Sequence, residues 1–220
     1  GVNNPIDLGI KGEPNPKIPH PSENDWNGLS LPWMSYGYGI LLTPLQILSF
    51  YNGIANNGEM VKPTFLESTS KLGSTNFYEF KKEIINPSIC SKKTLSIVQK
   101  MLLDVIHHKN GTAKNIKSEH IKIAGKTGTA QIGYGTDEIN YISSFVGYFP
   151  ADQPKYSCIV VVNSPNKDLG YYGSDVAAPV FKRIAEIIES CNNNPWGKAR
   201  NLVDCSCLSV SFDFDFVEDH

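Results

Sequence analysis

Apolar residues recur along this chain with two different periods, which separate its predicted helices from its predicted strands. After Thr43 they recur every three or four positions. Pro44 suits the first turn of a helix, and Gln46 completes a capping box with Thr43. Gly58 supplies the stop signal. Helical spacing of this kind predicts three helices, at residues 43–58, 91–106 and 174–190.

Three other segments are rich in β-branched and aromatic residues, which is typical of strands. They cover residues 121–132, 142–149 and 156–163. The Gly-rich stretch 133–137 joins the first two, and connections this short favour antiparallel neighbours. The predicted fold class is therefore α+β, an antiparallel sheet with helices packed on it.

The two ends of the chain follow neither period. Residues 1–35 contain six prolines and few apolar runs, so we expect an extended, turn-rich leading segment. Residues 192–195 are predicted to be a linker. Residues 210–216 alternate strictly between apolar and polar residues, as a half-buried strand or an exposed tail would. We assign residues 1–190 to one domain and leave 191–220 as a tail or the start of another module.

Composition excludes some functions. A formal charge of −2 over 220 residues gives no support for nucleic-acid binding. No stretch approaches the roughly 20 apolar residues that a membrane-spanning helix needs. The sequence begins at Gly1 without methionine or a signal peptide. We therefore expect an excised or processed piece, with any membrane anchor outside it.

The cysteines do not form a metal-binding pattern. Their odd number and the absence of a Cys-x-x-Cys pair argue against a zinc site or a disulfide scaffold. Cys158 lies in an apolar run and is interpreted as a core residue. Whether two of the later cysteines pair is left open by the sequence. The five are Cys90, Cys158, Cys191, Cys205 and Cys207.

The main chemical signal is Lys126-Thr127-Gly128-Thr129 in the first predicted strand. It combines the charge, hydroxyl groups and backbone donor of an acyl-transfer site, although alone it could equally be an edge strand that ends in solvent. Several neighbouring blocks give it context. In chain order these are Ser35-Tyr36-Gly37-Tyr38-Gly39-Ile40, Thr43-Pro44-Leu45-Gln46, residues 55–63, Asn110-Gly111-Thr112-Ala113 and residues 144–150.

With the Lys-Thr-Gly element, these blocks resemble the transpeptidase domain of class B penicillin-binding proteins over residues 5–190. The resemblance implies the C-terminal part of a penicillin-binding or serine β-lactamase-like fold. It also implies a D,D-transpeptidase that cross-links peptidoglycan stem peptides through a serine acyl-enzyme and binds β-lactam antibiotics. The implied partners are glycan-polymerising and division or elongation proteins. The implied location is the extracytoplasmic face of a bacterial cytoplasmic membrane, without cofactor or metal.

The resemblance also assigns roles to residues. Lys126 would place a positive charge beside the nucleophile. Thr127 and Thr129 would offer hydroxyl groups to the terminal carboxylate of the substrate, and the Thr129 N–H would be one oxyanion donor. Gly128 would let the substrate approach the backbone. Tyr134, in the stretch after the strand, would line the cleft, although a plain hairpin loop is an equal alternative there.

The nucleophile of this family opens a Ser-x-x-Lys motif. Residues 68–71 fit that spacing, and residues 74–76 fit the Ser-x-Asn element. Both lie in a polar, turn-like stretch without helical period and come after the Gly-Tyr-Gly block, whereas the family places them before it. We interpret them as loop residues, so the nucleophilic serine is expected outside this chain. The chain by itself is predicted to be inactive.

The sequence is also compatible with three alternatives. A penicillin-sensing or non-catalytic docking homologue would share the Lys-Thr-Gly element. A serine β-lactamase would share it too, but the Gly-Tyr-Gly and Thr-Pro-Leu-Gln blocks favour a transpeptidase. His107 and His108 could be general bases, but at the end of a predicted helix they more simply interact with its negative C-terminal end.

Overall fold

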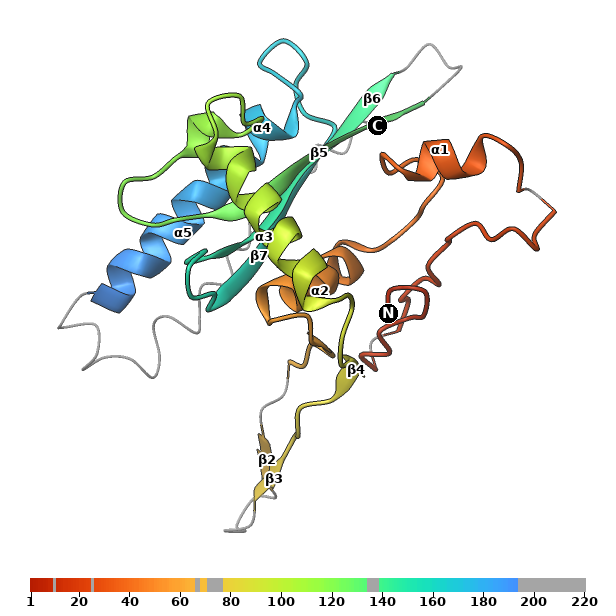
Figure 1. The fold of residues 1–220 in the computed structure, drawn as a ribbon, viewed down its shortest axis with the longest axis horizontal. Helices are drawn as coiled ribbons and strands as arrows, with labels where there is room; N and C mark the ends of the chain where they lie inside the picture. The colour runs from red at the N-terminus through yellow and green to blue at the C-terminus, as the bar shows by residue number, and fades with distance from the viewer. Residues whose placement is uncertain (10, 25, 66–67, 71–76, 134–138, 194–220) are drawn as a thin grey trace, which may run out of the picture.

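The structure, a computed structural model, describes residues 1–9, 11–24, 26–65, 68–70, 77–133 and 139–193 (Figure 1). Its main sheet has the order β5-β6-β7, with helices on both sides. The described elements are α1 (Ser30–Met34), α2 (Pro44–Ala55), β1 (Met60–Val61), β2 (Ser68–Ser70), β3 (Phe77–Glu79), β4 (Ile84–Asn86), α3 (Lys92–His107), the 3-10 turn η1 (Lys114–Ile116), β5 (Ala124–Ile132), β6 (Asn140–Phe149), β7 (Tyr156–Asn163), α4 (Gly173–Val176) and α5 (Ala178–Asn193).

The predicted α+β class is confirmed, and β5, β6 and β7 are antiparallel neighbours as expected. The strand boundaries differ slightly from the prediction. β5 begins at Ala124, because Ile121 and Ile123 lie in the buried core before the strand instead of inside it. β6 begins two residues earlier than predicted, at Asn140, where it pairs with Ile132 at the end of β5.

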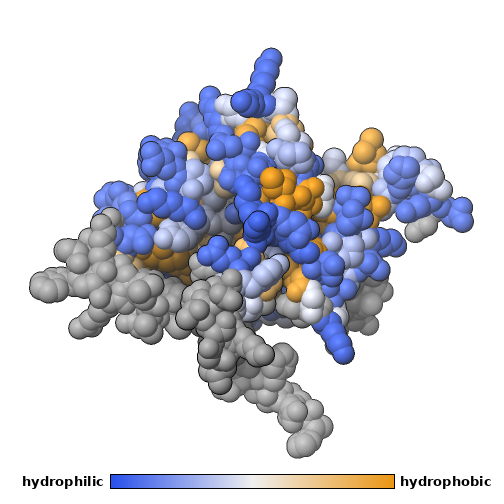
Figure 2. Space-filling view, turned by 90° about the horizontal axis from the view of Figure 1, so that it is seen from below, coloured by the Kyte–Doolittle hydropathy of each residue, from blue (hydrophilic) through white to orange (hydrophobic). Residues whose placement is uncertain are grey.

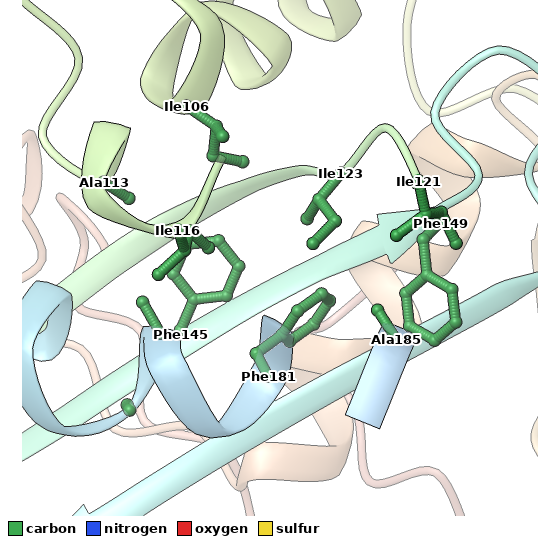
Figure 3. Close-up of a cluster of buried hydrophobic side chains, with 11 residues drawn as sticks. Ile106, Ala113, Ile116, Ile121, Ile123, Phe145, Phe149, Phe181 and Ala185 are labelled. Atoms are coloured by element: carbon green, nitrogen blue, oxygen red, sulfur yellow. The ribbon is translucent and has the colours of Figure 1, made fainter. Parts of the chain in front are cut away.

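The two faces of the sheet bury different clusters, because successive residues of a strand point to opposite sides. On one face Phe145 and Phe149 of β6 pack against Phe181 of α5 (Figure 3). On the other face Tyr148 of β6 joins a cluster with residues of α2 and α3. That second cluster comprises Ile54, Leu95, Leu102, Ala124 and Tyr148. The sheet is thus fixed from both sides.

Local sequence explains where the first two predicted helices begin. The Gln46 N–H donates to Thr43 Oγ1 at 3.1 Å, and the Thr43 N–H donates to Gln46 Oε1 at 2.8 Å, so the predicted capping box is present. The Thr94 N–H donates to Ser91 Oγ at the start of α3. Gly58, just after α2, has a φ of 91°, in the left-handed region that favours glycine.

Three local predictions were wrong. The helix predicted at 174–190 is divided at Ala177 into α4 and α5, and Pro179 lies in the first turn of α5, where a missing N–H is tolerated. The leading segment 1–35 is not wholly extended, because it contains the short helix α1. Residues 68–70, predicted to be loop, form β2 and pair with β3. Lys71 and residues 74–76 lie outside the described residues.

The polar surface and the partly buried Cys158 are typical of a globular protein. The face seen in Figure 2 is largely hydrophilic, with apolar side chains gathered between the polar ones. Cys158 packs against the α5-side cluster, as predicted, and burial raises the pKa of its thiol to about 11. Cys205 and Cys207 lie outside the described residues. In the part of the chain that the structure describes, no helix is long and apolar enough to cross a bilayer.

Candidate active site

The Lys-Thr-Gly-Thr segment lies in the middle of β5, at an edge of the main sheet. β5 pairs with β6 on one side, where Gly128 is opposite Ser144 and Thr129 is opposite Ser143. Among the described strands none pairs with the other edge of β5. An edge strand presents unpaired backbone N–H and C=O groups to which an extended peptide can add. The structure therefore places all four predicted residues beside an available backbone edge.

Lys126 has its ammonium group close to the next residue. Its Nζ donates to the carbonyl oxygen of Thr127 at 2.8 Å and lies 3.4 Å from Thr127 Oγ1. Burial lowers the pKa of Lys126, because a partly dehydrated ammonium group loses favourable interactions with water. The Lys126 ammonium group thus lies beside Thr127. It loses its proton at a lower pH than the ammonium group of a solvated lysine does.

Thr127 is approached by a second threonine from the loop after α3. Thr112 Oγ1 lies 3.5 Å from Thr127 Oγ1. The loop folds back on the end of α3 through a hydrogen bond from the Ala113 N–H to the Val105 carbonyl oxygen. A Cβ on Gly111 would lie 2.3 Å from that same oxygen, so only glycine allows this path. The Asn110–Ala113 block contained this signal, although sequence reasoning did not single out Thr112.

Thr129 contacts the start of α4. Its Oγ1 accepts the N–H of Gly173 at 3.0 Å, which leaves its own hydroxyl proton available for another acceptor. A Cβ on Gly173 would lie 2.4 Å from the carbonyl oxygens of Gly128 and Ser144. Close contact between α4 and the sheet therefore requires glycine at this position, a role that sequence reasoning missed.

Glycine at position 128 also has a structural role, in addition to the predicted role of letting the substrate approach the backbone. A Cβ at this position would lie 2.5 Å from Ser144 Oγ across the strand pair. Glycine therefore avoids a steric clash with the Ser144 side chain on the neighbouring strand. Aromatic rings lie near the start of α4, where Tyr171 stacks on Tyr141 of β6 at 4.2 Å between ring centroids. The Ser143 hydroxyl donates to the Tyr171 carbonyl oxygen and fixes that segment to β6.

The other predicted candidates lie elsewhere. Tyr134 is outside the described residues. Ser68 begins β2, in a hairpin that projects away from the main sheet (Figure 1). His107 is the last residue of α3 and His108 is its C-cap, the positions predicted for them. Burial lowers the pKa of His107. The described residues include no group of three or more His, Cys, Asp or Glu side chains that could hold a metal ion.

Comparison with known families gives this geometry a context. The profile described as "Penicillin binding protein transpeptidase domain" matches residues 1–186. The chain belongs to this family. The class B resemblance is likewise shown, because relatives of this transpeptidase family include the peptidoglycan D,D-transpeptidase FtsI of Buchnera aphidicola subsp. Baizongia pistaciae. It is 32% identical over 188 residues, which are 84% of this chain and 31% of that protein.

Other family members agree in sequence and in fold. Penicillin-binding protein PbpB of Mycolicibacterium smegmatis is 29% identical over 205 residues, 89% of this chain and 31% of the relative. Two structures of penicillin-binding protein 3 from Mycobacterium tuberculosis, one apo and one complexed with aztreonam, superimpose with TM-scores of 0.75 and 0.72. Both are 28% identical, and each match covers 89% of this chain and 45% of the solved one. The chain thus spans about a third of the length of these curated relatives.

Proposed function

We propose that this chain forms one wall of the acyl-transfer site of a peptidoglycan D,D-transpeptidase, and that residues 1–190 belong to that domain. The observation that carries the proposal is the position of Lys126, Thr127 and Thr129 on the unpaired edge of β5, flanked by the loop of Thr112 and the start of α4. Family membership and the names of the relatives support the same reaction.

The substrate would bind as an extended peptide along β5. Its terminal carboxylate would accept hydrogen bonds from the hydroxyl groups of Thr127 and Thr129, and hydrogen bonds to an ionised acceptor are the stronger kind. The positive charge of Lys126 would attract the same carboxylate. Gly128 would keep the strand surface open to the substrate backbone.

The chemical step would use a serine outside these 220 residues. Its oxygen would attack the penultimate D-alanine carbonyl, whose developing negative charge would be stabilised by the Thr129 N–H. The peptide bond would then break, and the terminal D-alanine would leave as an amine with the serine proton. An amine of a second stem peptide would attack the resulting ester, form the cross-link and release the serine. A β-lactam would acylate the same serine by opening its ring.

Two features support a nucleophile outside the chain. Ser68 lies in a strand, whereas a Ser-x-x-Lys nucleophile begins a helix so that its lysine lies one turn further on the same face. Ser68 also belongs to a hairpin separate from the main sheet. By family, the protein would work at the extracytoplasmic face of the bacterial cytoplasmic membrane, with glycan-polymerising and division or elongation partners.

Removing the Thr127 hydroxyl tests the proposed carboxylate contact. In the full-length transpeptidase, Thr127→Val should lower the second-order rate constant of β-lactam acylation by about tenfold or more, because a hydrogen bond to a charged group contributes roughly 1.5–3 kcal/mol. Stopped-flow or gel-based reporter labelling measures this constant. Thr127→Ser should retain most of the rate, and Thr69→Val on β2 is the matched control. An unchanged rate in Thr127→Val would exclude the contact.

A further inference from the structure

The backbone on both sides of Gly173 is held by side chains from two other elements. From β6, the hydroxyl of Ser143 donates to the Tyr171 carbonyl oxygen, and Ser143 is fully buried. From η1, the side-chain Nδ2 of Asn115 donates to the Ser174 carbonyl oxygen at 2.9 Å. Gly173 lies between these two acceptors in the sequence. The two hydrogen bonds therefore fix the position of its N–H group relative to the sheet.

Asn115 has a firm support, although its own side chain is exposed. Its neighbours Ala113 and Ile116 are 0% and 1% exposed and belong to the buried cluster on the α5 side of the sheet (Figure 3). The same loop carries Thr112, whose hydroxyl lies 3.5 Å from that of Thr127. One short segment thus reaches Thr127 directly and the start of α4 through Asn115.

The Gly173 N–H group determines how the Thr129 hydroxyl can be used. Thr129 Oγ1 accepts this N–H at 3.0 Å, so one of its lone pairs is occupied and its single proton is directed elsewhere. A carboxylate can only accept hydrogen bonds, so a hydroxyl that is held as a donor suits it. If the start of α4 moved away, the hydroxyl could rotate, because hydrogen bonds weaken outside their preferred geometry.

We propose that Ser143 and Asn115 are positioning residues of the acyl-transfer site. They hold the Gly173 N–H on Thr129, and the Thr129 hydroxyl is thereby kept as a donor to the terminal carboxylate of the substrate. Ser143 is well placed for this, because it lies directly opposite Thr129 in the β5–β6 pair. This role rests on the proposed function, since it depends on the contact between Thr129 and the carboxylate.

A double-mutant cycle in the full-length transpeptidase tests the proposal, with the rate constant of acylation by a reporter β-lactam as the readout. Asn115→Ala and Ser143→Ala should each lower this constant by about two- to tenfold, the factor that corresponds to one neutral hydrogen bond. Thr129→Val removes the hydroxyl and keeps the backbone N–H. In that background neither substitution should lower the constant further, because the group that they position is absent.

Asn56→Ala is the matched control. Asn56 is exposed beyond the end of α2, and its Nδ2 likewise donates to a backbone carbonyl oxygen, that of Glu59, at 3.0 Å. It contacts none of the residues assigned to the acyl-transfer site, so its variant should keep the wild-type rate constant.

Hydrogen exchange gives a second readout that does not depend on the reaction. In the full-length protein, the Gly173 amide should exchange about two- to tenfold faster in Asn115→Ala and Ser143→Ala than in the wild type, because its local opening becomes easier. Amides of β7 should exchange as in the wild type, which shows that the variants are folded.

The outcomes separate this role from the proposed function. If Thr129→Val slows acylation but Asn115→Ala and Ser143→Ala do not, the positioning role is overturned and the carboxylate contact stands. If both substitutions slow acylation equally with and without the Thr129 hydroxyl, they act on the fold in general, and the positioning role is again overturned. If Thr129→Val leaves the rate unchanged, the carboxylate contact of Thr129 fails and the positioning role fails with it.

Discussion

Replacing Lys126 with alanine in the full-length transpeptidase is expected to lower the rate of β-lactam acylation by about 10²- to 10³-fold, the usual effect of removing one group that stabilises charge in an acyl-transfer site. Lys126 supplies the positive charge of the β5 edge, and its ammonium group lies within hydrogen-bonding distance of Thr127. In the proposed reaction, that charge would attract the carboxylate and favour a deprotonated nucleophile. Single-turnover labelling with a reporter β-lactam measures the rate.

The pH dependence gives a second readout of the same variant. Because burial lowers the pKa of Lys126, its positive charge is lost as pH rises through a value below that of an ordinary lysine. The wild-type acylation rate should therefore show a decline at alkaline pH that Lys126→Ala lacks. Lys122→Ala, which removes an exposed lysine paired with Asp152, is the control and should keep the wild-type rate. A Lys126→Ala protein that acylates normally would contradict the role assigned to this residue.

Truncating Phe181 to alanine should destabilise the fold by about 3–5 kcal/mol, the range for loss of a buried phenylalanine. The side chain is fully buried on α5 and packs edge-on against Phe145 at 4.8 Å and Phe149 at 5.6 Å between ring centroids (Figure 3). Its removal leaves a cavity on the α5 side of the sheet, the face that Thr127 shares with its cross-strand neighbour Phe145. Urea unfolding of wild type and variant, followed by circular dichroism, gives the difference in free energy of unfolding.

The matched control is Phe65→Ala, because Phe65 is 70% exposed and has little packing to lose. Its free energy of unfolding should stay within about 0.5 kcal/mol of wild type. If Phe181→Ala were equally mild, α5 would not be the element that holds the main sheet from that side.

Much of the fold could be predicted from the sequence where local chemistry decides it. Thr43 with Gln46 begins α2 as predicted, since a capping box needs only residues three apart. The strands β5, β6 and β7 follow from β-branched and aromatic runs with short connections. The close contact of α4 with the sheet could not be predicted in this way, because Gly173 fits against the backbone oxygens of Gly128 and Ser144, which are far away in the sequence.

The candidate site likewise has one part that could be predicted from local sequence and one part that could not. The motif itself identified Lys126, Thr127, Gly128 and Thr129, because consecutive residues on one strand stay together in any fold. Thr112 comes from a different element, fifteen residues before Thr127, and only the return of its loop along α3 brings the two hydroxyls together. The proposed role of Tyr134 stays a prediction.

The central claim is that this chain carries the substrate-binding wall of the site without its nucleophile. Its most direct test is intact-mass spectrometry after incubation with a reporter β-lactam. It is applied to the folded 220-residue chain and to the full-length transpeptidase, and any adduct is mapped by peptide sequencing. We predict no adduct on the chain, and a single adduct on the full-length protein at a serine outside residues 1–220. An adduct on the chain alone, above all at Ser68, would contradict the claim that these residues carry the substrate wall of the site without its nucleophile.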